Sequence, residues 1–138
     1  MRLGNEPIEL PLSPLGHTWI LDLDGTLVKH NGYKLNGHDS FVDGAKEFLD
    51  RIKPQDMVIL LTSRTEDVRA ETEFFLRENG VRYDAIIYNA PYGERILIND
   101  DKPSGLRMAV AVEKERDSGL KLQIIEDEDQ ARSRQDVI

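Results

Sequence analysis

The sequence predicts an α/β fold, a Rossmann-like three-layer sandwich with a central, mostly parallel sheet. Short apolar runs alternate along the chain with stretches in which apolar residues recur at helical spacing. This order of elements is typical of a parallel sheet with covering helices. The clearest run, residues 57–61, is apolar throughout, as expected of a strand that is buried on both faces. With 138 residues, the chain is expected to form a single domain.

The composition of the chain disfavours some kinds of binding partner and indicates where the protein is located. The net charge of −8 makes nucleic acid and anionic membranes poor partners. The chain has no cysteine, which excludes disulfides and thiolate chemistry. It has neither a long apolar stretch nor a charged-then-apolar leader, so a soluble cytoplasmic protein is the expectation. Nothing in the sequence indicates the oligomeric state.

The first predicted strand follows an N-terminal arm, residues 1–16, which contains three prolines. Residues 19–28 begin as an apolar run and then place Asp22 and Asp24 two positions apart, followed by Gly25. Residues 29–37 contain two Asn-Gly steps, which are strong turn signals, and are predicted to form a hairpin or flap. In this flap, His30 and Tyr33 are either ligand contacts or polar parts of an exposed loop.

The remaining elements follow from apolar periodicity and from capping signals. A helix is predicted from Asp43, as its cap, to about residue 53, where Pro54 ends it. A second helix is predicted over residues 66–79, with acids in its first turn and Gly80 after its end. Further strands are expected over residues 83–88, 96–99, 108–112 and 122–125, and an exposed tail over residues 126–138.

Asp22 and Asp24 admit two interpretations. Residues two apart on an extended chain point to the same side, so these two carboxylates face alike and repel each other unless a cation lies between them. Mg²⁺ would suit such hard oxygen ligands. Asp-Gly after a strand is also an ordinary turn signal. An EF-hand loop is disfavoured, because no ligand spacing ending in Glu follows and apolar Leu23 and Leu27 interrupt it.

Polar residues at the ends of two other predicted strands favour a site over a simple turn. Thr62 follows the strand at residues 57–61, and Asp100 and Asp101 follow the strand predicted at residues 96–99. The carboxyl edge of an open parallel sheet is where ligands bind, and all of these strands end there. The alternative is that Thr62 and the acid pair are helix caps.

These residues resemble the motifs of the haloacid dehalogenase (HAD) superfamily of phosphotransferases. The matching stretches, in order, are Asp22-Leu23-Asp24-Gly25-Thr26, Leu60-Leu61-Thr62 and Ile98-Asn99-Asp100-Asp101. They are similar to the superfamily's first, second and fourth motifs, and the short chain resembles its capless small phosphatases. Residues 83–84, 91–93 and 98–100 are also similar to small phosphatases of surface-polysaccharide and sugar-nucleotide pathways.

The resemblance implies a role for each residue. Asp22 would attack a phosphoryl group to form an aspartyl-phosphate, and Asp24 would act as general acid and base. Mg²⁺ would be held by Asp22, the backbone carbonyl of Asp24, Asp100 and Asp101. The phosphate oxygens would accept hydrogen bonds from Thr62 and from backbone N–H groups near Gly25 and Ser63.

The Lys or Arg of the superfamily's third motif has no counterpart at its usual place, where residues 89–91 read Asn-Ala-Pro. Arg95 would begin the strand predicted at residues 96–99, which puts it at the opposite edge of the sheet, roughly 16 Å from Asp100. Lys102 is therefore the predicted cation, with Arg64 as its rival.

Two functions remain open. The first is a Mg²⁺-dependent phosphomonoester hydrolase acting on a small metabolite such as a sugar phosphate. The second is a catalytically weak phosphate- or metal-binding regulatory domain. A D-x-D glycosyltransferase is excluded, because so short a chain leaves little room for a sugar-nucleotide domain.

Overall fold

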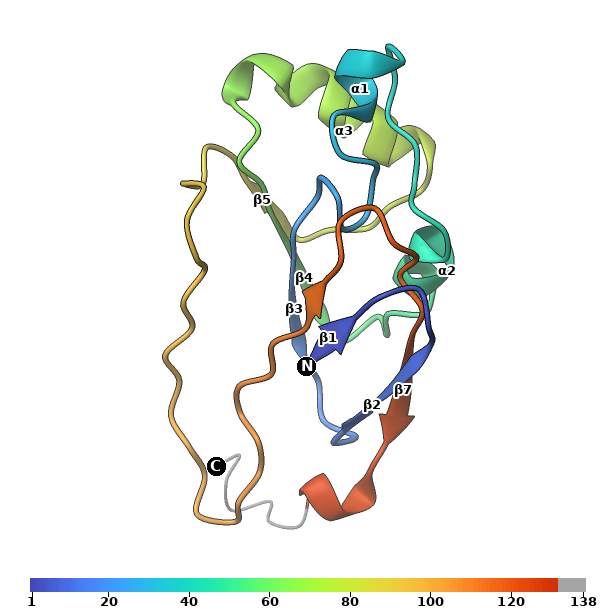
Figure 1. Ribbon diagram of the computed structural model, residues 1–138. Helices are drawn as coiled ribbons and strands as arrows, with labels where there is room; N and C mark the ends of the chain where they lie inside the picture. The colour runs from blue at the N-terminus through green and yellow to red at the C-terminus, as the bar shows by residue number, and fades with distance from the viewer. Residues whose placement is uncertain (132–138) are drawn as a thin grey trace.

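A computed structural model describes residues 1–131 of the chain. Its central sheet contains three parallel strands in the order β3-β4-β5: β3 (Thr18–Leu21), β4 (Met57–Leu61) and β5 (Ala85–Ile87). The β4 strand has the bounds expected from its apolar run. It pairs with β3 on one side and β5 on the other, and its Val58 and Leu60 are almost completely buried. All three strands end toward the upper part of Figure 1.

Two further pairs of parallel strands join the two ends of the described chain. Strand β1 (Arg2–Leu3) pairs with β6 (Glu113–Lys114), and β2 (Ile8–Leu12) pairs with β7 (Leu122–Glu126). Residues 1–16 therefore contain two strands, and the edge strand expected at residues 122–125 is confirmed as β7.

The helices are short and follow the central strands. The described helices are α1 (Gly32–Leu35), α2 (Ala45–Asp50) and α3 (Arg69–Glu78), with 3₁₀ turns η1 (Glu66–Val68) and η2 (Glu128–Ala131). The helix expected over residues 66–79 is confirmed as η1 and α3. None of the helices in the described residues is long and apolar enough to span a membrane.

One apolar core joins these sheets and helices. Leu23 and Leu27, from the turn after β3, are at most 1% exposed and pack with Leu60 of β4 and Leu76 of α3. Leu10 of β2 belongs to the same cluster. Leu23 and Leu27 thus anchor the turn that carries Asp22 and Asp24 to the core, because buried side chains cannot move without opening a cavity.

A buried carboxylate positions the start of β3. Asp56, which precedes β4, accepts hydrogen bonds from the Trp19 indole Nε1 at 2.9 Å and from the His17 backbone N–H at 3.0 Å. The exposed fraction of Asp56 is 4%, so these hydrogen bonds are shielded from water. A hydrogen bond is electrostatically stronger in the protein interior than in water. The two bonds to Asp56 hold β3 in register with β4.

Several expectations from the sequence need correction. The α/β character and the parallel pairing are confirmed, but residues 1–131 form three small sheets, and the single central sheet of a three-layer sandwich is not confirmed. The flap at residues 29–37 contains α1 rather than a hairpin. Helix α2 is preceded by Gly44, not by Asp43, because the chain there adopts a φ of +80° that glycine tolerates. Of the tail expected at residues 126–138, the last seven residues lie outside the described part.

The strands expected at residues 96–99 and 108–112 do not form. Residues 91–112, which we call the projecting loop, have no regular secondary structure. Figure 1 shows this loop in yellow and orange, descending beside the molecule and returning toward β6. Apolar residues are therefore not sufficient for a strand here, because a strand also needs a neighbour that accepts its backbone hydrogen bonds.

Candidate functional site

Asp22 is the first residue after β3, and each of its carboxylate oxygens accepts a hydrogen bond. The Thr26 hydroxyl donates to Oδ2 at 2.8 Å, and Nη1 of Arg95 donates to Oδ1 at 3.0 Å. The side chains of Asp22 and Arg95 are 36% and 35% exposed, respectively. Asp22 is thus oriented from both sides and still reaches solvent.

The turn after Asp22 is closed by backbone contacts. Gly25 has a φ of +82°, which strains any residue with a Cβ. Its N–H donates to the carbonyl of Val28 at 2.7 Å, and its carbonyl accepts from the N–H of Asp117 at 2.9 Å. The Asp117 carboxylate also accepts from the backbone N–H of His30 at 2.7 Å. The segment around Asp117 therefore braces both the Asp22 turn and the start of the flap.

Asp24 contacts a different side chain from those that contact Asp22: it forms a two-point ion pair with Arg64. Nε of Arg64 donates to Oδ2 of Asp24 at 2.9 Å, and Nη2 donates to Oδ1 at 2.8 Å. The Arg64 side chain is only 2% exposed, against 22% for Asp24. Such a planar fork is among the strongest charge-assisted contacts in proteins.

The rest of the Arg64 guanidinium is used by a second carboxylate and a hydroxyl. Asp39 accepts from Nη1 at 3.0 Å and from Nη2 at 2.7 Å, and the Thr72 hydroxyl accepts from Nη1 at 2.9 Å. A guanidinium has five N–H donors, and all are engaged. Although burial alone lowers the pKa of Arg64, the hydrogen bonds and charges of Asp24 and Asp39 outweigh it and raise the pKa. Arg64 is therefore a charged residue at the centre of a buried network.

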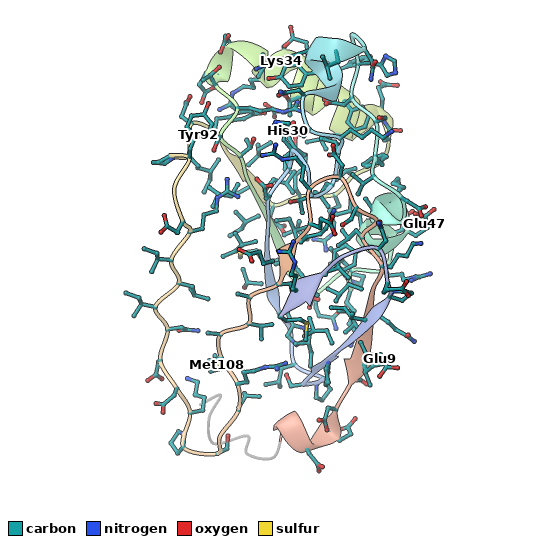
Figure 2. The ribbon with its side chains drawn as sticks, in the orientation of Figure 1. Glu9, His30, Lys34, Glu47, Tyr92 and Met108 are labelled. Carbon is teal, nitrogen blue, oxygen red and sulfur yellow. The ribbon has the colours of Figure 1, made fainter. Side chains whose placement is uncertain are left out.

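Tyr33 covers this network from the flap. Its ring lies 4.3 Å from the guanidinium carbon of Arg64, within the range of a cation–π contact. The flap residue Lys34 lies farther out, at the outer end of α1 (Figure 2), with its Nζ 5.6 Å from the same ring. Of the two flap residues singled out from the sequence, Tyr33 thus supports Arg64, and His30 is held by its backbone.

Thr62 and Ser63 follow β4, at the same end of the sheet as Asp22. The side-chain oxygen of Thr62 accepts the backbone N–H of Arg64 at 3.0 Å, and Thr62 is 1% exposed. Ser63 is half-buried. The proximity of these β4-end residues to the Asp22 turn follows from the parallel pairing of β3 with β4.

Two predicted phosphate ligands are corrected by these contacts. Arg64 has no N–H left for a phosphate, because its five donors are bound within the protein. The N–H of Gly25 is likewise not free, since it donates to Val28. Both residues build the site, but neither is placed to contact a ligand directly.

The acid pair Asp100 and Asp101 is not brought to Asp22 within one chain. Both residues are exposed in the projecting loop, and the Asp100 carboxylate pairs with Nζ of Lys102 at 3.3 Å. Residues 1–131 contain no group of three or more acidic or histidine side chains arranged to hold a metal. The donors among these described residues therefore do not fit Mg²⁺, which needs several oxygens in a near-octahedral shell.

The position predicted for Arg95 is wrong. With no strand at residues 96–99, Arg95 is not carried to the opposite edge, and its guanidinium reaches Asp22. Lys102, the predicted cation, lies instead beside its sequence neighbour Asp100. Arg95 is the cation that the structure places next to Asp22.

Asp39 was missed by the sequence analysis. It stands among polar residues after the flap and has no distinctive spacing from Asp22 or Asp24. The available signal was indirect: a buried arginine needs carboxylate partners. Thr72 of α3, which is 1% exposed, was likewise not recognised as a partner of Arg64.

Comparisons with family models, with curated proteins and with solved structures found no match to this chain.

Proposed function

We propose that this chain is a phosphomonoester hydrolase in which Asp22 is the nucleophile, acting on a small phosphorylated metabolite such as a sugar phosphate. The observation that carries the proposal is the state of Asp22: a partly exposed carboxylate at the end of β3, with Thr26 on one oxygen and Arg95 on the other. The motifs that resemble the HAD superfamily support the same reaction class.

The residues of this chain would divide the chemistry as follows. An Asp22 oxygen attacks phosphorus, the P–O bond to the leaving group breaks, and an aspartyl-phosphate forms. Arg95 stabilises the charge that develops on the phosphoryl oxygens. Water then attacks phosphorus and gives a proton to Asp24, and the P–O bond to Asp22 breaks, which releases phosphate and restores the Asp22 carboxylate.

Asp24 is the proposed proton donor to the leaving oxygen. In the resting structure both of its oxygens accept from Arg64, so one of these hydrogen bonds has to be exchanged for a proton taken from solvent, which that oxygen then donates to the leaving oxygen of the substrate. The 22% exposure of the Asp24 side chain leaves room for that exchange. Mg²⁺, which the family resemblance implies, would supply further charge neutralisation, but the described residues of one chain lack the donors to hold it.

A second candidate is a phosphate-binding regulatory domain with little turnover. The two-point ion pair between Asp24 and Arg64 favours it, since both carboxylate oxygens of Asp24 already accept hydrogen bonds from Arg64. Phosphate binding without hydrolysis would identify this function.

The test is phosphate release from a panel of phosphomonoesters with and without Mg²⁺, for the parent chain and for Asp22→Asn. We expect turnover by the parent and none above background by the variant, with thermal stability close to that of the parent because functional carboxylates are seldom stabilising. Asp50→Asn, which changes an exposed carboxylate on α2, is the matched control and should keep full activity. Undiminished hydrolysis by Asp22→Asn would refute the covalent mechanism.

A further inference from the structure

The segment that joins β6 to β7, residues 115–121, crosses the turn after β3. Figure 1 shows this segment in orange, arching beside that turn on its way to β7. The contact with the turn is direct, because the backbone N–H of Asp117 donates to the carbonyl of Gly25 at 2.9 Å. The position that a Cβ on Gly25 would occupy lies 3.3 Å from Cγ of Arg116 and 3.9 Å from its Cα. The stem of Arg116 therefore covers the backbone of Gly25.

The backbone on both sides of Arg116 is held in place. The N–H of Glu115 donates to the carbonyl of Leu3 at 2.8 Å, and the carbonyl of Glu115 accepts from the hydroxyl of Ser118 at 2.8 Å. On the other side, Asp117 has a φ of +61°, which a residue with a Cβ keeps only where its surroundings fix it. The Arg116 side chain thus starts from a fixed backbone, so a ligand that binds it has to order the side chain alone.

The Arg116 guanidinium has no partner among residues 1–131, where its side chain is exposed and takes part in no hydrogen bond, ion pair or ring contact. The acids on either side of it in the sequence make other contacts. Asp117 accepts the backbone N–H of His30 at 2.7 Å. Oε2 of Glu115 lies 3.3 Å from the position that a Cβ on Gly4 would occupy, in the N-terminal segment. The positive charge of Arg116 is therefore available to a ligand.

The location of Arg116 distinguishes it from an ordinary exposed arginine, which is common on protein surfaces. Gly25, which it covers, directly follows Asp24, the proposed proton donor to the leaving oxygen. Asp22, which would receive the phosphoryl group, is instead contacted by Arg95 from the projecting loop. Arg95 therefore lies beside the place of the phosphoryl group, and Arg116 lies beside the place of the leaving group.

We propose that Arg116 binds an anionic group on the leaving group, so that the preferred substrates of this chain are phosphomonoesters that carry a second anion. This inference rests on the proposed function and narrows its substrate class. The second anion is a carboxylate or a phosphate, because the planar fork of a guanidinium matches two oxygens of either group. Since Arg116 acts away from the reacting phosphorus, it contributes to substrate binding and not to the chemical step.

The charge of the chain makes the effect of Arg116 measurable. With a net charge of −8, the protein repels a ligand with two anionic groups more than a ligand with one. A second anion would therefore weaken binding unless a cation lay next to it. Arg116 supplies that cation, and its removal should turn the preference for the second anion into indifference or discrimination against it.

Two matched pairs of phosphomonoesters test the proposal. Phosphoserine differs from phosphoethanolamine by one carboxylate. Ethylene glycol bisphosphate differs from ethylene glycol monophosphate by a second phosphate, and its two phosphates are equivalent, so it does not matter which of them reacts. For the parent chain we expect a higher kcat/KM for the member with the second anion in at least one pair, and the pair that responds identifies the anion.

Arg116→Ala should lower kcat/KM for the member with the second anion by about 10- to 100-fold, chiefly through KM, and change the other member by less than about threefold. Arg116→Lys keeps the charge but loses the planar fork, so we expect a loss between these two values. Arg51→Ala is the matched control, because Arg51 is an exposed arginine at the end of α2; it should alter neither member of a pair.

Calorimetric titration measures the same preference without turnover. The Asp22→Asn chain, which is not expected to hydrolyse the ligands, is titrated with both members of each pair, and so is a chain that carries Asp22→Asn together with Arg116→Ala. We expect the single variant to bind the member with the second anion about tenfold more tightly or better. The added Arg116→Ala change should remove that difference.

The outcomes separate this inference from the proposed function. If the titrations show a preference that depends on Arg116 but the parent releases no phosphate, the hydrolase assignment fails and the anion site stands. If the parent hydrolyses both members of each pair equally well, or if Arg116→Ala weakens both members alike, the anion site is overturned while the hydrolase assignment stands. Absence of both binding and hydrolysis for every ligand would overturn both.

Discussion

Arg64 illustrates how the hydrogen bonds of one side chain determine its role. The sequence predicts a phosphate ligand at this position, because Arg64 is a cation that follows the second strand of the central sheet. In the folded chain the guanidinium joins the turn after β3, the segment after the flap and α3, through Asp24, Asp39 and Thr72. Its positive charge stabilises the fold, because it offsets the repulsion between the carboxylates of Asp24 and Asp39, which both bind it.

Arg64→Met is expected to lower the free energy of unfolding by roughly 3–5 kcal/mol, because the buried carboxylate of Asp39 loses its partner. Chemical denaturation of the parent and the variant measures the difference. Arg69→Met is the matched control: Arg69 also forms ion pairs, with Glu66 and Glu73, but its side chain is 45% exposed. That change should cost less than about 1 kcal/mol. Equal losses in the two variants would show that burial of Arg64 is not what matters.

Arg95→Ala is expected to lower kcat/KM for a phosphomonoester by roughly a hundredfold, about 2.7 kcal/mol in transition-state stabilisation. The reason is that Arg95 is the cation in contact with Asp22. Steady-state kinetics with saturating Mg²⁺ compares this variant with Lys102→Ala, for which we expect a smaller loss. A larger loss in Lys102→Ala would show that Lys102, the cation predicted from the sequence, stabilises the transition state.

At the scale of residues, the sequence predicts the positions of side chains that directly follow a clear apolar run. Asp22, Asp24 and Thr62 lie at the ends of β3 and β4, as expected from the apolar runs before them. Asp39 was not predicted and Arg95 was predicted at the wrong edge, because their positions depend on contacts between segments distant in the sequence.

At the scale of elements, burial explains which predictions succeeded. Strand β4 and helix α3 were predicted closely, because several of their apolar residues, including Val58, Leu60 and Leu76, are buried in the core and follow the spacing of the element. The segment at residues 96–99 has the composition of a strand, but in the described part of the chain it has no neighbour to pair with. Single-sequence patterns report that a segment is suited to pairing, not that a partner is present.

The start of α2 gives a test of backbone strain combined with close contact. Gly44 has a φ of +80°, and a Cβ there would lie 2.9 Å from the carbonyl oxygen of Leu120. Gly37 has the same φ of +80° with nothing within 4 Å. We expect Gly37→Ala to destabilise the fold by about 1 kcal/mol and Gly44→Ala by at least about twice as much. Thermal unfolding of the two variants measures both; similar melting temperatures would mean that α2 and the Leu120 segment separate readily.

The pairing of the chain's two ends has a consequence for its synthesis. Strand β2 cannot pair until β7 exists, because Ile8 lies opposite Leu122. At translation rates of roughly 5–20 residues per second, the first strands wait on the order of 5–20 s after leaving the ribosome. During that time Leu3 and Leu10, which end almost fully buried, remain exposed on a nascent chain. The N-terminal segment is therefore where a ribosome-associated chaperone has the longest access to this protein, and where aggregation during synthesis would begin.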